Sequence, residues 1–403
     1  MNYLVIGGGV IGISIGTALL ENDSKNKVTI VEKESSLGAH ASGRNSGVIH
    51  AGFYYSPESL KARFCADGNR ELKTLCRKYG IPMKEIGKVV VTKSESELPQ
   101  LEKLFQRGLA NGIDIELKHS KELARIEPAA STVGEFLWSP TTAIADSTAV
   151  INQLAKNFQN LGGKLILSSE VTLKKLGEEI HAIIDGKHFH SDFIVNAAGV
   201  HADRLARSVG VGLEFVCLPF MGLYRVSKQT SQSSKSLIYP VPHPLNPFLG
   251  AHLTITLSGD IKIGPTAIPL LGREQYSLKS KISIPEIRDA IAGVRALIRG
   301  KEYDFPEIVR SELPKVLTRL LVKEVAEIVP DLQKINGWTK LPPGIRAQLV
   351  NLKSGVLEQD FIVRNHSNSI HILNAVSPGW TSALPFGRWV ARLISNGEST
   401  QKV

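Results

Sequence analysis

The N-terminal segment carries the pattern that most constrains the fold. A short apolar run over residues 3–6 is followed at once by glycines at the spacing G-x-G-x-x-G, namely Gly7, Gly9 and Gly12. An apolar stretch typical of a helix comes next, and a second apolar run over 27–31 ends in Glu32. In such a unit the glycines allow a tight turn, close approach of a pyrophosphate and close helix–strand packing. The phosphates meet the positive end of the helix.

Glu32 indicates which dinucleotide this turn binds. An acidic residue at this distance accepts hydrogen bonds from a ribose diol, which favours FAD or NAD over NADP. The alternative is a glycine-rich turn in an ordinary strand–helix unit, but the strand before, the helix after and the closing acid argue against it. The uncharged run from Tyr3 to Leu20 fits a buried parallel strand and its helix better than a signal peptide or a membrane span.

Composition excludes several classes of protein. The chain has 403 residues, of which 42% are hydrophobic and 21% charged, so disorder, collagen and coiled coil are excluded and two or three domains are expected. The three cysteines, Cys65, Cys76 and Cys217, form no C-x-x-C pair. They predict reduced thiols in a cytoplasmic protein and no metal site.

The chain is basic, with 48 Lys and Arg against 38 Asp and Glu, a formal charge of +10. Such a balance is compatible with nucleic acid, an anionic membrane surface or small anionic ligands. No run of five basic residues is present, so we expect no nucleic-acid partner and favour small anions. Peripheral contact with the inner membrane surface stays open at this point.

A loop rich in Gly, Ser and Asn follows Glu32. Its stretch SGRNSGVIHAGFYY (42–55), followed by SLKARFC (59–65), resembles the D-amino-acid-oxidase superfamily of FAD-dependent oxidoreductases. Within it, the chain is most similar to the L-2-hydroxyglutarate dehydrogenase (oxidase) family. Further matching stretches follow in the expected order: GKVVV (87–91), IVNAAGVHADRLA (194–206), FLGAHLT (248–254), GIRAQ (344–348) and NAVSPGWTSALPFG (374–387).

The resemblance implies an α/β fold with two interleaved domains. We expect a doubly wound, Rossmann-like FAD-binding domain from residues 1–80, 145–215 and 340–403. An α+β substrate domain built on an antiparallel sheet is expected from 81–144 and 216–339. Apolar residues at helical spacing within 287–298 and 313–321 predict core-facing helix stripes; they are Ile287, Ile291, Val294, Ile298, Leu313, Leu317, Leu320 and Leu321.

The resemblance also implies which residues hold FAD. Gly7, Gly9 and Gly12 would hold the pyrophosphate and Glu32 the adenosine ribose. The remaining predicted cofactor residues lie in three stretches: Ser42, Arg44, Asn45 and Ser46 beside pyrophosphate and flavin; Ala198 and Gly199 at the end of the strand 193–196; and Gly379, Thr381 and Ser382 at a helix start against the flavin pyrimidine.

The implied reaction is oxidation of L-2-hydroxyglutarate, or a close 2-hydroxy acid, to the 2-oxo acid by hydride transfer to FAD. A histidine near neutral pKa suits removal of the hydroxyl proton, and either His252 or His50 fits. Arg346 is the predicted carboxylate clamp, and Tyr239 a hydroxyl donor to the carboxylate. Electrons would pass to an acceptor such as quinone or oxygen.

Alternatives remain at this stage. A mid-strand histidine such as His252 is often structural, and Arg346 can form a surface salt bridge instead. The family usually carries a basic residue before Gly222 and a polar one after it, where this chain has Met221 and Leu223, which leaves the choice of 2-hydroxy acid open. An amino-acid oxidase, a glycerol-3-phosphate-type dehydrogenase, and a nucleic-acid or membrane binder with a vestigial flavin site are the competing functions.

Overall fold

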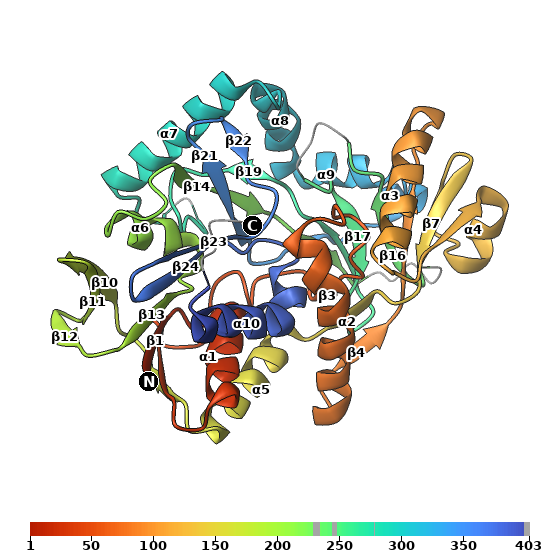
Figure 1. Ribbon diagram of the computed structural model, residues 1–403. Helices are drawn as coiled ribbons and strands as arrows, with labels where there is room; N and C mark the ends of the chain where they lie inside the picture. The colour runs from red at the N-terminus through yellow and green to blue at the C-terminus, as the bar shows by residue number, and fades with distance from the viewer. Residues whose placement is uncertain (229–233, 244–247, 278, 399–403) are drawn as a thin grey trace.

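The computed structural model describes residues 1–228, 234–243, 248–277 and 279–398 (Figure 1). Its central sheet is parallel except at one edge, where β23 and β24 pair in antiparallel fashion. The strands in spatial order are β23 (Ile362–His366), β24 (Ser369–Asn374), β13 (Phe193–Asn196), β1 (Asn2–Ile6), β2 (Lys27–Val31) and β9 (Lys164–Ile166). The glycine turn therefore follows a central strand.

Helices cover one face of the central sheet. They are α1 (Val10–Asn22), α5 (Ser147–Asn160) and α10 (Gly379–Asn396), and α2 (Leu60–Tyr79) packs on α10. Figure 1 shows α10, in blue, lying across α1, in red. The two helices approach closely because Gly387 has no side chain: a Cβ there would lie 2.7 Å from the backbone carbon of Ser14.

A small antiparallel sheet and a short helix cover the opposite face. They are β10 (Val171–Leu176), β11 (Glu179–Ile184), β12 (Lys187–Phe189) and α6 (Ala202–Arg207). Strand alternation divides β1 between the two layers, since Tyr3 and Val5 face the helices and Leu4 and Ile6 face this second layer. Because both faces are buried, the strand is a continuous apolar run.

A large mixed sheet forms the other half of the molecule. In spatial order its strands are β20 (Thr339–Lys340), β15 (Arg225–Ser227), β18 (Ile261–Gly264), β17 (His252–Ile255), β16 (Leu237–Pro240), β5 (Lys88–Val91), β7 (Glu135–Ser139) and β6 (Glu116–His119). Its pairs are antiparallel apart from β16 with β5. Helices α4 (Ser120–Ile126) and α9 (Thr318–Val325) cover one face, and α3 (Leu98–Ala110) packs on the other.

Two smaller sheets join these halves. One contains β19 (Ile268–Pro269), β14 (Phe215–Gly222), β21 (Gly344–Asn351) and β22 (Val356–Leu357), covered by α7 (Ile284–Gly300) and α8 (Phe305–Glu312). The other contains β3 (Val48–Ile49), β8 (Ala143–Ala145) and β4 (Met83–Glu85). Since β14 pairs with β21 along its whole length, segments from both expected domains share a sheet, and the domain division stays a prediction.

The predicted core stripes are largely wrong. Ile291, Ile298, Leu313, Leu317 and Leu320 are exposed, and of the two series only Leu321 is fully buried. Small residues of α7, Ala290, Gly293 and Ala296, face the sheet instead, because a Cβ on Gly293 would already touch Val216. Helical periodicity identified an apolar face but not which face packs inward.

Within the described ranges, no helix has both the length and the apolar character that crossing a bilayer requires.

Candidate active site

A cavity of about 670 Å³ runs between the central sheet and the large mixed sheet. It begins at the carboxyl ends of β1, β2 and β13, the edge where open parallel sheets bind ligands. The predicted residues that line it are Gly7, Gly9, Glu32, Ser42, Arg44, Asn45, Ser46, His50, Ala198, Gly199, Tyr239, His252, Arg346, Gly379 and Thr381. Gly12 and Ser382 do not line it.

The glycine turn brings bare backbone to the cavity. Gly7 has φ +109°, and a Cβ there would lie 2.4 Å from the carbonyl oxygen of Ala197, so no other residue fits. A Cβ on Gly12 would lie 2.0 Å from the carbonyl oxygen of Gly7. Gly12 therefore acts by packing the helix on the turn, which explains its place behind the cavity wall.

Two side chains complete the turn. Ser42 Oγ accepts a hydrogen bond from the N–H of Val10 at 3.0 Å, at the start of α1. Glu32 is buried, and its two carboxylate oxygens accept from the N–H groups of Gly8 at 2.7 Å and Glu34 at 2.9 Å. Each oxygen can accept a further hydrogen bond, so Glu32 keeps capacity for a ribose hydroxyl.

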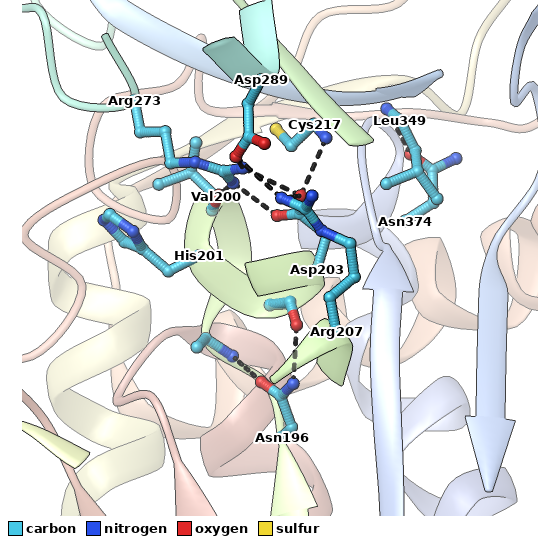
Figure 2. A network of polar contacts seen from close by, with 12 residues as sticks. Asn196, Val200, His201, Asp203, Arg207, Cys217, Arg273, Asp289, Leu349 and Asn374 are labelled. Atoms are coloured by element: carbon cyan, nitrogen blue, oxygen red, sulfur yellow. Dashed lines mark hydrogen bonds and ion pairs between the residues drawn. The ribbon is translucent and has the colours of Figure 1, made fainter. Parts of the chain in front are cut away.

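Asn196 shapes the second predicted cofactor segment. Its side chain donates to the carbonyl of Ala202 at 2.8 Å and accepts from the N–H of Ala198 at 3.3 Å (Figure 2). The chain then turns at Gly199, whose φ is +55°. The main chain of Ala198 and Gly199 is thereby held beside the glycine turn, since Gly7 nearly touches Ala197.

The loop after Glu32 is held by its own polar side chains. Asn45 donates to the carbonyl of Ser42 at 2.6 Å and accepts from the N–H of Gly47 at 2.8 Å. Arg44 donates from Nε to the carbonyl of Ala39 at 2.8 Å. Lys262 of the mixed sheet donates to the carbonyl of Ser46 at 2.9 Å, which ties the loop to the other half of the molecule.

The start of α10 closes the cavity next to His50. The Thr381 hydroxyl accepts from the N–H of His50 at 3.2 Å, so this side chain positions the His50 main chain. The N–H of Ser382 bonds to the carbonyl of Pro378 at 2.9 Å, and Gly68 packs against the Ser382 backbone. Ser382 thus lies inside the helix packing, away from the cavity.

Tyr239 and His252 form a stacked pair at the other end of the cavity. Their ring centroids are 3.6 Å apart and the planes differ by 16°. His252 Nδ1 lies 2.9 Å from the carbonyl oxygen of Gly250. A carbonyl only accepts, so Nδ1 carries the proton and Nε2 is left as an acceptor. Burial, as the main cause, lowers the pKa of His252 to about 3, below the near-neutral value expected of the base, so the ring is neutral at physiological pH.

Arg346 reaches the same end of the cavity from β21. Its Nε donates to Gln348 Oε1 at 2.9 Å, and its guanidinium lies 5.3 Å from the centre of the Phe248 ring. No carboxylate is paired with it among the described residues. Burial lowers the pKa of Arg346 to about 10, so it remains charged at neutral pH. A buried cation with unused donors is suited to an anionic ligand.

The departure from the family pattern at Met221 and Leu223 does not affect the cavity lining. Phe220 of β14 stands opposite Arg346 in the register, and Phe220, Gly222 and Tyr224 line the cavity, whereas Met221 and Leu223 do not. Alternate residues of a strand face opposite sides. The basic residue usual in the family would therefore point away from the cavity at this position.

Sequence reasoning missed a segment that crosses the cofactor end of the cavity, the strap formed by residues 270–277. Glu274 pairs with Lys33 at 2.7 Å and with His201 at 2.8 Å. Tyr276 accepts or donates at His40 Nδ1, 2.8 Å away, and lies 4.3 Å beneath the Arg44 guanidinium. The strap residues are distant in sequence from their partners, by 73 residues between Glu274 and His201 and by 236 between Tyr276 and His40. No local sequence pattern therefore predicts the strap.

A buried ion-pair network anchors the strap (Figure 2). Arg273 pairs with Asp203 of α6 and, at 2.7 Å, with Asp289 of α7, which also pairs with Arg207 at 2.7 Å. Burial would raise the pKa of Asp203, but the charge and hydrogen bonds of Arg273 outweigh it and hold the pKa below its usual value. A paired carboxylate of this kind is costly to break, since removal of one partner leaves a buried charge.

Comparison with known proteins identifies the class. A family model described as FAD dependent oxidoreductase matches residues 2–393. The L-alpha-glycerophosphate oxidase of Mycoplasma pneumoniae with FAD bound superposes with a TM-score of 0.77 at 25% identity, covering 98% of this chain and 94% of that one. A glycine oxidase from Geobacillus kaustophilus, at 17% identity and TM-score 0.71 over 99% and 95% of the two chains, shows the fold alone. The fold and the cavity define an FAD-dependent oxidoreductase.

Relatives across nearly the whole chain narrow this class. The L-2-hydroxyglutarate dehydrogenase of Escherichia coli K12 is 34% identical over 98% of this chain and 93% of its own length. The mitochondrial L-2-hydroxyglutarate dehydrogenase of Bos taurus is 32% identical over 97% and 88%. The chain belongs to the FAD dependent oxidoreductase family, and within it to the L-2-hydroxyglutarate dehydrogenases. The predicted fold class, family and cofactor are confirmed.

The cavity fits FAD in its chemistry. The turn presents main chain to the cavity at Gly7, where a Cβ would clash with Ala197. It lies next to the positive end of α1, which suits a pyrophosphate. Glu32 offers spare acceptors for a ribose. The individual roles of these residues stay predictions.

We expect Glu32→Gln to weaken FAD binding by roughly tenfold to hundredfold, the loss of a hydrogen bond to a charged group. The substitution replaces the carboxylate of Glu32, which accepts hydrogen bonds at both oxygens, by an amide of equal size beside Gly8. The dissociation constant is measured by titrating apoprotein with FAD and following flavin fluorescence. Glu21→Gln, at an exposed position of α1, is the matched control; equal affinities in all three proteins would remove Glu32 from the cofactor site.

Proposed function

We propose that the chain oxidises L-2-hydroxyglutarate, or a close 2-hydroxy acid, to the 2-oxo acid with FAD as the electron acceptor. The observation that carries the proposal is the arrangement of Arg346 and His252 at one end of a cavity whose other end has the glycine turn. Relatives named L-2-hydroxyglutarate dehydrogenase support the substrate.

Arg346 binds the substrate carboxylate in this proposal. Gln348 holds its Nε, which leaves the terminal nitrogens for a bidentate pair with a carboxylate. Tyr239 stands on the same side of the mixed sheet as the His252 ring that it stacks on, and its hydroxyl is the further donor. Burial raises the pKa of Tyr239 far above its usual range, so it remains a donor at every physiological pH.

His252 accepts the hydroxyl proton at Nε2. The contact of Nδ1 with the Gly250 carbonyl fixes the tautomer, and burial keeps the ring neutral. Bound flavin supplies the acceptor for the hydride from the α-carbon. The C–H electron pair leaves as hydride, the O–H proton goes to His252, and the C–O bond becomes the carbonyl of the 2-oxo acid.

Amino-acid oxidation and glycerol-3-phosphate oxidation remain the competing reactions, because related folds carry out both types. A buried Arg clamp binds any carboxylate, including that of an amino acid. The identity of the relatives favours the 2-hydroxy acid, and glycerol 3-phosphate lacks the carboxylate that the clamp fits.

We further propose that electrons leave to a quinone at an anionic membrane surface. On α7, Ile284, Ile291 and Ile298 are 67%, 40% and 52% exposed. Arg288 and Arg295 are also exposed, and their spacing from these isoleucines puts them on the same helix face. An apolar stripe beside arginines is the pattern of an interfacial helix on anionic lipid.

The substrate proposal predicts selective flavin bleaching. Under anaerobic conditions, L-2-hydroxyglutarate should reduce the bound flavin. The reduction is measured as the loss of flavin absorbance near its visible maximum. The D enantiomer, glycine, L-proline and glycerol 3-phosphate should reduce it far more slowly. Faster bleaching by an amino acid or by glycerol 3-phosphate would overturn the assignment.

Arg346→Ala should raise KM for the hydroxy acid roughly tenfold to hundredfold while FAD stays bound, since a charge-assisted hydrogen bond is lost. Arg346→Lys keeps the charge but not the fork and should recover part of the loss. Arg364→Ala, on β23 and outside the cavity lining, is the control. An unchanged KM in Arg346→Ala contradicts the clamp.

The membrane proposal predicts binding to vesicles that contain phosphatidylglycerol and little binding to pure phosphatidylcholine. Co-sedimentation should fall in the double variant Ile291→Glu, Ile298→Glu and at high salt. Leu176→Glu, at an equally exposed site on β10, should behave as the unmodified protein. Equal sedimentation of all three proteins would exclude α7 as the contact.

A further inference from the structure

Lys88 is a buried cation that no step described so far uses. It is the first residue of β5, its side chain is fully buried, and no carboxylate is paired with it in the part of the chain that the structure describes. Taking an ammonium out of water without an ionic partner costs several kcal/mol. A methionine would fill the same space without that cost, so packing alone does not account for a lysine here.

The surroundings of Lys88 are largely aromatic. Its Nζ lies 4.2 Å from the centre of the Tyr239 ring, 5.1 Å from Tyr54 and 5.6 Å from Phe53. The nearest hydrogen-bonding atom is His50 Nδ1, at 3.4 Å. Lys88 thus lies behind the cavity wall and contacts two of its lining residues, His50 and Tyr239.

His50 is held from all sides. Its N–H donates to Thr381, and its carbonyl accepts from Asn69 Nδ2 at 3.1 Å and from Cys65 Sγ at 3.5 Å. The main chain is therefore fixed, and the ring depends on Lys88 for its protonation pattern. A charged lysine has donors and no acceptor, so Nδ1 of His50 must accept, and the ring proton must reside on Nε2.

We propose that Lys88 is a positioning residue that holds His50 in the Nε2–H form, so that His50 offers a donor to the cavity while His252 offers an acceptor. The two histidines then have opposite tautomers, because Nδ1 of His252 faces a carbonyl and Nδ1 of His50 faces an ammonium. This inference rests on the proposed oxidation and deepens it: His252 is the base, and His50 is a hydrogen-bond donor toward flavin or substrate.

Electrostatics agree with this assignment. Burial first, then the charges of Lys88 and His252, hold the pKa of His50 well below its usual range, so the ring is neutral and has a tautomer to select. Burial lowers the pKa of Lys88 to about 7, and the neighbouring Cys65 of α2 opposes this. The other titratable groups around Lys88 are His252, whose pKa burial lowers, and Tyr54 and Tyr239, whose pKa values burial raises far above neutrality.

The control of the His50 tautomer by Lys88 depends on pH, because the protonated and neutral forms of lysine differ in hydrogen-bonding capacity. Below its pKa, Lys88 is charged and forces the Nε2–H form of His50. Above it, the neutral amine also has a lone pair, so both tautomers of His50 become compatible with the contact. The population of the Nε2–H form, and with it the rate of flavin reduction, should decline as pH rises through the pKa of Lys88.

The direct test is the tautomer of His50 in the unmodified holoprotein without substrate. Long-range ¹H–¹⁵N correlation spectra of ¹⁵N-histidine-labelled protein distinguish Nδ1–H from Nε2–H, and His50→Asn assigns the signal. We expect Nε2–H for His50 and Nδ1–H for His252 at pH 6. A proton on Nδ1 of His50 overturns the proposal, whether or not any Lys88 variant folds.

Variants separate positioning from packing. In Lys88→Met the tautomer of His50 should become mixed, and anaerobic flavin reduction should slow about tenfold or more, as when a partner that orients a functional histidine is lost. Lys88→Arg keeps a permanently charged donor; it should keep the Nε2–H form and lose the decline at alkaline pH. Lys73→Met, which removes a buried lysine paired with Glu85 outside the cavity, should change none of these.

If the His50 tautomer and the pH profile of flavin reduction are unchanged in Lys88→Met, the proposal is wrong and Lys88 serves only in packing. Failure of the proposed function shows differently: unmodified protein would then not be bleached by L-2-hydroxyglutarate, whatever the tautomer of His50.

Discussion

The close contact between Gly7 and Ala197 is the constraint on which the rest of the site depends. It joins the ends of β1 and β13, the two strands whose following turns both reach the cofactor end of the cavity. A Cβ at Gly7 would force these turns apart, and Gly12 packs α1 onto the carbonyl of Gly7 itself. Ser42 and Glu32 then bond to main-chain N–H groups at the turn. These contacts hold the start of α1 at the cavity wall, where Gly9 and Val10 line it.

Neutral histidines and one buried cation, Arg346, line the cavity, and two more lysines, Lys88 and Lys262, lie behind its wall. Arg346 and Lys88 have no carboxylate partner among the described residues, and Lys262 bonds to the main chain of Ser46. Burial lowers the pKa of Lys262 to about 8, and it also lowers the pKa values of His252 and His50, which are neutral. Such a site is unfavourable when empty and more favourable when it holds an anion, since an anion supplies the missing partner. Of the +10 charge of the chain, Arg346 is the part that lines the cavity and can meet a carboxylate directly.

Some site residues could be found from the sequence because they follow an element end. Gly7, Gly9 and Glu32 lie at the ends of β1 and β2, and Ala198 at the end of β13; parallel strands bring such ends to one edge. Lys88, Glu274 and Tyr276 carry no local pattern. Lys88 begins β5 in the large mixed sheet, and His50 follows β3 in a different sheet, so only the packing of the two sheets brings them together. The exposed stripe of α7 misled for the same reason, because periodicity does not show which face another element covers.

The sequence by itself determined the dinucleotide turn, the family and the cofactor, because these depend on short segments whose spacing is set by backbone geometry. It left open which histidine accepts the proton and whether Met221 alters the substrate end. Tertiary structure decided the side to which Met221 points and the hydrogen-bond contacts of the two histidines, from which we propose the base. The carbonyl of Gly250 and the ammonium of Lys88 differ in hydrogen-bonding capacity, which separates His252 from His50. Strand alternation turns Met221 away from the cavity and Phe220 toward it.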